Sequence, residues 1–157
     1  MVLRAPAQLY AWNAGWLLGQ RFLLLTHVGR RTGRLHRTVL EVIGTRPAGG
    51  EFLVVAGLGR SANWYRNLQA GPAVEVAVGR RRFRPGHRTL SEGEAIAAFA
   101  AYERRNRLVT PVVRVVLSWL VGWRYDGSDY ARRRLARELP VVAFRPADNQ
   151  AGTGRTR

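Results

Sequence analysis

The chain has 157 residues, and 46% of them are hydrophobic, which is enough for one globular domain with a core and too few for two. The formal net charge is +16, and all 26 basic residues are arginine. The absence of cysteine excludes a disulfide framework, a thiolate metal site and a thiol nucleophile. Arginine pairs bidentately with phosphate or carboxylate, so this charge favours an acidic partner. A GC-rich genome, whose codons favour arginine over lysine, would explain the excess of arginine equally well.

The N-terminal stretch has an apolar stripe at helical spacing. Leu9, Trp12, Trp16 and Leu17 predict a short amphipathic helix that ends near Gly19. We expect this stripe to cover the sheet, while closing a pocket and touching a membrane surface stay as alternatives. The stretch lacks the continuous apolar core of a secretory signal, so we expect a cytoplasmic protein.

Two extended apolar segments follow, over residues 22–28 and 35–43. They flank the glycine-bounded turn Gly29-Arg30-Arg31-Thr32-Gly33, which predicts two strands joined in a hairpin. The turn would hold two guanidinium groups and free backbone N–H groups at a fixed point on the rim of a sheet. This makes the turn a candidate seat for an anion.

A third strand is expected over residues 52–56, and a short helix over residues 64–70. Ser61 or Asn63 can cap this helix at its start. The helix N-terminus and the nearby Arg60 form a second place where an anion could bind.

Further strands are expected over residues 74–78 and 82–89, and a closing strand over residues 139–144. The sheet should therefore be mainly antiparallel. Because proline donates no hydrogen bond to a ladder, Pro140 moves the closing strand toward a sheet edge.

Three more helices are expected, over residues 91–105, 111–123 and 131–137. The first begins with the capping box Ser91-Glu92-Gly93-Glu94. The second is apolar almost all round, so it should be buried or meet a partner. It is too short to span a bilayer and carries Arg114.

Several chemistries lack the residues that they need. His27, His36 and His87 are scattered and have no paired carboxylates at ligand spacing, so no metal is expected. The sequence contains no nucleophile elbow, phosphate-binding P-loop or dinucleotide fingerprint. No pair among the ten acidic residues suits glycoside hydrolysis. An enzyme of this sequence would use a cofactor for its chemistry.

Three motifs occur in order along the chain: Leu23-Leu24-Leu25-Thr26 with Gly29-Arg30-Arg31-Thr32-Gly33 and Arg37-Thr38; Trp64-Tyr65-x-Asn67-Leu68 with Pro72-x-Val74-x-Val76; and Asp129-Tyr130 with Leu139-Pro140-Val141-Val142. Taken together in order and spacing, they resemble the deazaflavin (coenzyme F420)-dependent nitroreductase and quinone reductase family. The resemblance covers roughly residues 20–146.

The resemblance implies an α+β fold: a mainly antiparallel split β-barrel, similar to that of flavin reductases, with helices packed outside. We expect a single domain over residues 1–147 and a disordered tail over residues 148–157. The implied activity is hydride transfer from reduced coenzyme F420 to a quinone, a nitro compound or another electrophilic small molecule. FMN is a less favoured cofactor. The oligomeric state stays open, with a homodimer as one option.

The resemblance also implies roles for particular residues. The tail or phosphate of the coenzyme would contact Arg30, Arg31, Thr32 and Gly33, with a further basic contact from His36 or Arg37. The loop after the third strand and the following helix would lie near the deazaflavin ring and the phosphate, through Ala56, Gly57, Leu58, Arg60, Asn63, Trp64 and Asn67. Tyr130 would lie on the substrate side, where a tyrosine hydroxyl or water supplies the proton.

The coenzyme carries a phosphodiester and an oligoglutamate tail, so an arginine-rich rim and a helix N-terminus suit it. Two other classes of function stay as alternatives. One is a binding module for an acidic partner such as nucleic acid, although the aromatic residues do not alternate with arginine along a strand as a stacking platform requires, so nucleic acid is not expected. The other is a lipid or fatty-acid binder, or a protein that lies on a membrane through residues 9–18 and 112–123.

Overall fold

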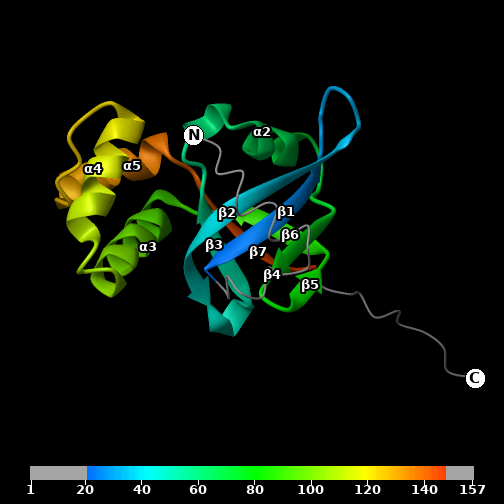
Figure 1. Cartoon of the computed structure of the whole chain (residues 1–157), viewed down its shortest axis with the longest axis horizontal. Helices are drawn as coiled ribbons and strands as arrows, with labels where there is room; N and C mark the ends of the chain where they lie inside the picture. The colour runs from blue at the N-terminus through cyan, green and yellow to red at the C-terminus, as the bar shows by residue number, and fades with distance from the viewer. Residues whose placement is uncertain (1–20, 148–157) are drawn as a thin grey trace, which may run out of the picture.

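The computed structural model describes residues 21–147, and its main body is a barrel-like sheet with helices around it (Figure 1). The predicted N-terminal helix and the predicted tail over residues 148–157 lie outside the described residues.

Seven strands form one sheet in the order β5-β4-β1-β2-β3-β7-β6. All of the strand pairs in residues 21–147 are antiparallel. The strands are β1 (Phe22–Val28), β2 (Leu35–Arg46), β3 (Glu51–Val55), β4 (Glu75–Val78), β5 (Arg81–Phe83), β6 (Pro85–Thr89) and β7 (Val141–Pro146). The long β2 belongs to both halves of the sheet and changes register between Val42 and Gly44.

The two ends of the sheet meet at Arg84. β5 and β6 stand at opposite ends of the strand order, yet only Arg84 separates them in the chain, so the sheet curls into a nearly closed barrel. The prediction of one strand over residues 82–89 is therefore wrong. Pro85 is the first residue of β6, a position where its missing N–H interrupts no hydrogen bond of the ladder.

The closing strand β7 also differs from its prediction. It pairs with β3 on one side and β6 on the other, so it is an inner strand, and the edge position predicted from Pro140 is wrong. The physical reason is that Pro140 precedes the strand, and its carbonyl accepts a hydrogen bond from the Ala56 backbone N–H (2.9 Å). The proline therefore lies outside the ladder that it would have interrupted.

Alternate residues of β3 and β7 separate two apolar clusters. Val54 and Phe144 belong to the cluster that also holds Trp64 and Leu68 of the following helix. Leu53 and Val141 belong to a second cluster, which lies between the outside of the barrel and the later helices. This period-two pattern is what the apolar runs predicted, and the expected mainly antiparallel split β-barrel with outer helices is confirmed.

Four helices lie in the described part of the chain: α2 (Asn63–Ala70), α3 (Glu92–Arg105), α4 (Thr110–Val121) and α5 (Asp129–Glu138). α2 lies over one end of the barrel, whereas α3, α4 and α5 form a group beside it (Figure 1). The capping box at the start of α3 is confirmed. The expected caps of α2 are wrong: Ala62 holds that position, and the Ser61 hydroxyl donates instead to the Leu58 carbonyl (2.8 Å).

The apolar helix α4 was expected to be buried or to meet a partner. None of its residues is buried, so burial in the core of this chain is not what the structure shows. Among residues 21–147, no helix has the length and apolar character needed to cross a bilayer.

Candidate functional site

Arg30 joins the β1–β2 hairpin to α2. Its backbone N–H donates to Asn67 Oδ1 (3.1 Å), and its Nη1 donates to the same oxygen (2.9 Å). Nη1 also lies 3.5 Å from Asn63 Oδ1. The structure thus brings together three predicted site residues from two separate parts of the sequence, and it fixes the hairpin against the helix.

His27 supports this junction, although no motif in the sequence pointed to it. The Asn67 amide NH₂ donates to His27 Nδ1 (3.0 Å), so Nδ1 is unprotonated and the neutral ring carries its proton on Nε2. Nε2 lies 3.0 Å from Thr38 Oγ1. Because Asn67 Oδ1 accepts from Arg30, the orientation of the amide is fixed from both sides.

Burial keeps His27 neutral. Its side chain is 3% exposed, and burial, followed by the nearby His36, lowers its pKa to about 4. A sequence signal for His27 existed, because it continues the inward-facing alternation of Leu23 and Leu25 along β1. A polar ring at such a position must find hydrogen-bond partners.

The low pKa of His27 predicts that acid weakens the fold. His27 is protonated near pH 6.5 in the unfolded chain but only near pH 4 in the folded chain. The contribution of neutral His27 to the free energy of unfolding is therefore complete above pH 6.5 and is lost as the pH falls toward 4. Between pH 7 and pH 5 the free energy of unfolding should fall by about 2 kcal/mol on account of His27. Urea unfolding at the two pH values measures the fall.

The matched variants are His27→Gln and His87→Gln. Burial also lowers the pKa of His87, so the free energy of unfolding of wild type should fall by more than His27 alone accounts for. The His27→Gln protein should lose most of the pH dependence, whereas His87→Gln should keep most of it. An equal fall in wild type and His27→Gln would contradict the assignment.

The hairpin and α2 concentrate positive charge, with no acidic ion-pair partner for Arg30, Arg31 or Arg66 in the described part of the chain. The pKa of Arg30 is lowered, first by burial and then by the charges of Arg66 and Arg31. None of the ion pairs between residues 21–147 includes these three arginines. Arg88, in contrast, is held by Glu51 and Glu94. Cations that lack a counter-charge in the protein fit an anionic group, which is the chemistry of the coenzyme's phosphate and glutamate tail.

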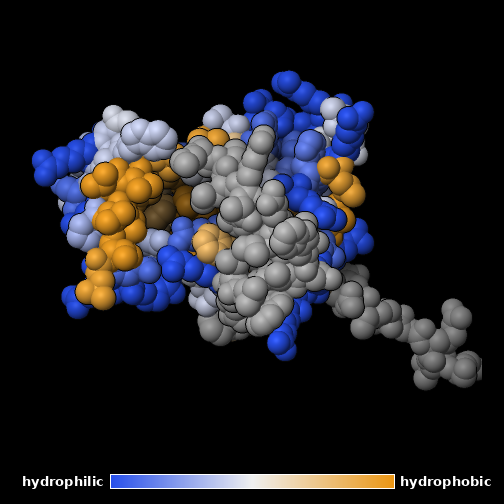
Figure 2. Space-filling view, in the orientation of Figure 1, coloured by the Kyte–Doolittle hydropathy of each residue, from blue (hydrophilic) through white to orange (hydrophobic). Residues whose placement is uncertain are grey.

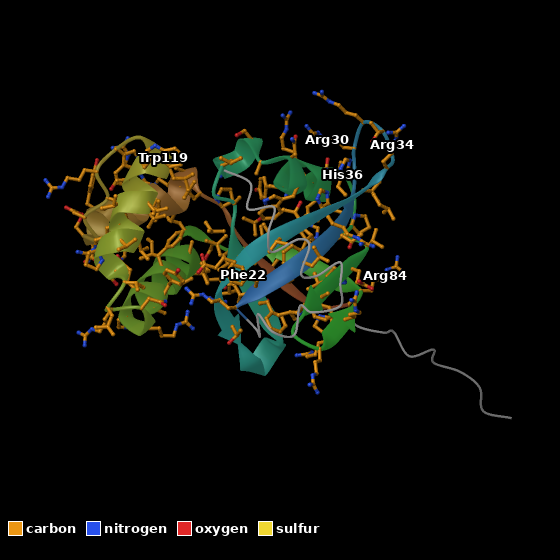
Figure 3. All side chains as sticks on the ribbon, viewed as in Figure 1. Phe22, Arg30, Arg34, His36, Arg84 and Trp119 are labelled. Carbon is orange, nitrogen blue, oxygen red and sulfur yellow. The ribbon has the colours of Figure 1, made fainter. Side chains whose placement is uncertain are left out.

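The rest of the hairpin is exposed around this cluster. Figure 3 shows Arg30, Arg34 and His36 gathered on it, away from the group of α3, α4 and α5. Thr32 and Gly33 form the turn, and Gly33 has a φ of 67°, which glycine adopts without strain. His36 stacks on His27 with ring centroids 5.7 Å apart. Arg37 is exposed on β2.

The loop after β3 runs between α2 and the outer helices. Ala56 is buried, Leu58 is 71% exposed and Arg60 is exposed. Gly57 faces α4, since a Cβ added there would lie 3.4 Å from Leu120 Cδ2. The loop therefore leads from α4 to the start of α2. Among the described residues, the Arg60 side chain forms no hydrogen bond with Arg30, Asn63 or Asn67.

Two predicted residues stand apart from the cluster. Trp64 is buried in the barrel cluster and meets Tyr65 edge to face, with centroids 6.1 Å apart, so it is a packing residue here. Tyr130 is 77% exposed on the first turn of α5, on the side of the molecule opposite the hairpin in Figure 1. Their contacts with the deazaflavin ring and the substrate stay predictions.

A cavity of about 260 Å³ lies elsewhere, between β2 and α3. It contains none of the predicted site residues, and across it the Tyr102 hydroxyl donates to Glu41 Oε1 (2.9 Å). Burial, followed by the charge of Glu41, raises the pKa of Tyr102 to about 12. The lining contains two arginines, but Glu41 pairs with Arg21 there, so the positive charge is partly compensated, unlike the charge at the hairpin.

Comparison with known proteins agrees with the family that the motifs resemble. The family model of the F420H(2)-dependent quinone reductases matches residues 4–119, which is more than half of the chain. No curated protein matches the sequence.

Solved structures of similar fold include an F420-H2 dependent reductase, with a TM-score of 0.51 and 18% identity over 80% of this chain and 95% of that chain. Another, described as a domain-swapped dimer, has a TM-score of 0.50 and 18% identity over 89% of this chain and 99% of that one. An FMN-binding protein related to pyridoxamine 5'-phosphate oxidase, from Nostoc punctiforme, has a TM-score of 0.49 and 14% identity over 93% and 81% of the two chains. Similarity at these identities concerns the fold.

The match to the family model, in contrast, spans both the hairpin and the α2 motif. The resemblance inferred from the three motifs is confirmed, and this chain belongs to the F420H(2)-dependent quinone reductase family, as an oxidoreductase that uses reduced coenzyme F420.

Proposed function

We propose that the β1–β2 hairpin and α2 hold the acidic part of coenzyme F420 and that the acceptor is a quinone. The observation that supports this most is the fixed Arg30, which Asn67 holds beside Arg31 and Arg66, two further cations without acidic partners in the described residues. A phosphodiester or carboxylate placed there would form charge-assisted hydrogen bonds with groups that are already oriented.

The chain's own residues would then position the reactants. Arg30 and Arg31 bind the acidic end, with Thr32, Gly33, His36 and Arg37 around them. The loop from Ala56 to Arg60, together with Asn63, would border the ring. Reduced coenzyme F420, when bound, supplies the hydride. A proton delivered to the quinone oxygen by Tyr130 or by water completes the hydroquinone, so the protein needs no nucleophile of its own.

The test is a fluorescence titration of the purified full-length protein with oxidised coenzyme F420 and, separately, with FMN. We expect saturable binding of the deazaflavin in the micromolar range and weaker binding of FMN. Quinone reduction should then be measured with the reduced coenzyme, by following its absorbance. A protein that binds neither cofactor would overturn the proposed site.

We also propose a cytoplasmic location, peripheral contact with a membrane, and a homodimer. The similar structure described as a domain-swapped dimer motivates the last of them. Sedimentation velocity tests it, and a monomer across the accessible concentration range would argue against it.

A further inference from the structure

α4 turns its polar side chains inward. Arg114 Nε lies 3.5 Å from Oε1 of Glu103, a buried residue of α3. The Ser118 hydroxyl accepts a hydrogen bond from the Tyr125 backbone N–H (2.8 Å) and donates to the Arg114 carbonyl (2.6 Å). The arginine and the serine of this helix are thus used to attach it to the rest of the protein.

The opposite side of α4 is apolar and exposed. Val112, Val115, Val116 and Trp119 are between 54% and 75% exposed, and their spacing places them on one side of α4. Val109 (45% exposed) and Leu108 (98% exposed) lie in the turn that leads into the helix. Figure 2 shows the aliphatic members of this set as an orange hydrophobic stripe. We call this the α4 face; it comprises Leu108, Val109, Val112, Val115, Val116 and Trp119.

Arginines flank the α4 face at both ends. Arg104 and Arg107 precede the helix, Arg124 follows it, and all three are exposed. α4 itself contains no acidic residue. The polar residues Arg114 and Ser118 contact the rest of the protein, whereas the aliphatic residues on the other side are exposed and bordered by cations, so that side is not suited to water. The pattern matches helices that lie in the interface of a membrane.

We propose that the α4 face docks on the surface of an anionic lipid membrane. The apolar side chains would enter the boundary between headgroups and acyl chains, with Trp119 at one end, while the flanking arginines contact lipid phosphates. At 12 residues α4 is too short to span a bilayer, so the contact is peripheral.

Charge decides between lipid and a second copy of this chain. A two-fold dimer through the α4 face would bring the same patch of each copy together, and with it the arginines of both copies. The whole chain carries a formal charge of +16, so the copies repel each other, whereas an anionic membrane attracts them.

The inner side of α4 connects this surface to the proposed site. Leu120 lies beside Gly57 of the loop after β3, since a Cβ added at Gly57 would meet it, so one helix separates the lipid surface from the loop expected to border the deazaflavin ring. On the proposed function, an apolar quinone dissolved in the bilayer would reach the protein on this side. Lipid docking itself does not depend on the reductase chemistry.

The test is co-flotation of the full-length protein with vesicles, without cofactor. We expect binding to vesicles of phosphatidylcholine mixed with phosphatidylglycerol at low salt, and much weaker binding to phosphatidylcholine alone. Val112→Gln with Trp119→Gln should lower the partition coefficient on the mixed vesicles by at least about 10-fold. The matched control, Leu35→Gln with Val74→Gln, removes exposed apolar residues elsewhere and should bind as wild type does.

Arg104→Ala, Arg107→Ala and Arg124→Ala together should weaken binding only to the anionic vesicles. Failure to float with mixed vesicles at low salt would overturn the proposal. The proposal would also be overturned if Val112→Gln with Trp119→Gln bound normally while Trp12→Ser with Trp16→Ser lost binding, because the lipid contact would then belong to the N-terminal stretch. If wild type were a dimer that did not bind vesicles, and Val112→Gln with Trp119→Gln made it monomeric, the α4 face would instead bind a second copy. Titration of the α4 variant with coenzyme F420 in vesicle-free buffer separates a failure of this proposal from a failure of the reductase site.

Discussion

Coenzyme F420 should bind at least about 100-fold more weakly when Arg30 and Arg31 are both replaced with alanine. Hydrogen bonds to charged groups contribute roughly 1.5–3 kcal/mol each, so losing two removes about 3 kcal/mol or more. Arg30 carries most of the effect, because Asn67 orients it before the ligand arrives. Fluorescence titration of wild type and variant with the oxidised coenzyme measures the change.

The matched control for this variant is Arg84→Ala with Arg133→Ala. It removes the same formal charge from two exposed positions away from the hairpin (Figure 3 shows Arg84). Its affinity should fall by less than about threefold, since exposed charges at a distance are screened by salt. Equal losses in the two double variants would mean that net charge, and not the hairpin, determines binding.

Asn67→Ala should lower both stability and cofactor affinity. The substitution leaves Arg30 without its acceptor and His27 Nδ1 without its donor at a buried position. The buried His27 Nδ1 that is left unsatisfied costs roughly 1–3 kcal/mol, so we expect the free energy of unfolding to fall by about that amount. Urea unfolding measures this fall, and titration at a temperature where the variant stays folded should show an affinity about 10-fold lower or more, because Arg30 is then mobile.

Asn63→Ala is the matched comparison for stability. It removes the same type of side chain from the same helix, near the same arginine, but Asn63 is exposed and its oxygen lies 3.5 Å from Arg30 Nη1. Its effect on the free energy of unfolding should stay within about 0.5 kcal/mol. If the two alanine variants were equally stable, the buried network would not hold the hairpin.

The strands of this fold could be read from the sequence because alternation along one chain segment is local information. Residues 22–28 and 35–43 predicted β1 and most of β2 for that reason. The position of β7 could not be read in this way. Its neighbours β3 and β6 are more than 50 residues away in the chain, and no local pattern records which edges finally meet. The effect of Pro140 was misjudged because it depends on where the strand begins.

The site was predictable to a similar degree. The hairpin arginines and Asn67 came from motifs, and the structure joins them. Nothing in the spacing showed that one amide would serve both Arg30 and His27, because that contact depends on how α2 lies over the barrel. The same holds for α4: its composition predicted burial or a partner, but only the folded structure shows that Arg114 takes the inner side and leaves the aliphatic side chains outside.

The place of β7 between β3 and β6 has a consequence for how the chain folds as it is synthesised. β6 pairs with β7 and with no other strand of the described residues, so residues 85–89 have no ladder until residues 141–146 have left the ribosome. The hairpin of β1 and β2 can form early, because its contacts are local. The barrel, however, must close late, by insertion of its last strand into a gap between two strands made long before. Until then the edge of β3 is exposed to other nascent chains, which makes this interval the one in which the protein most needs protection from aggregation.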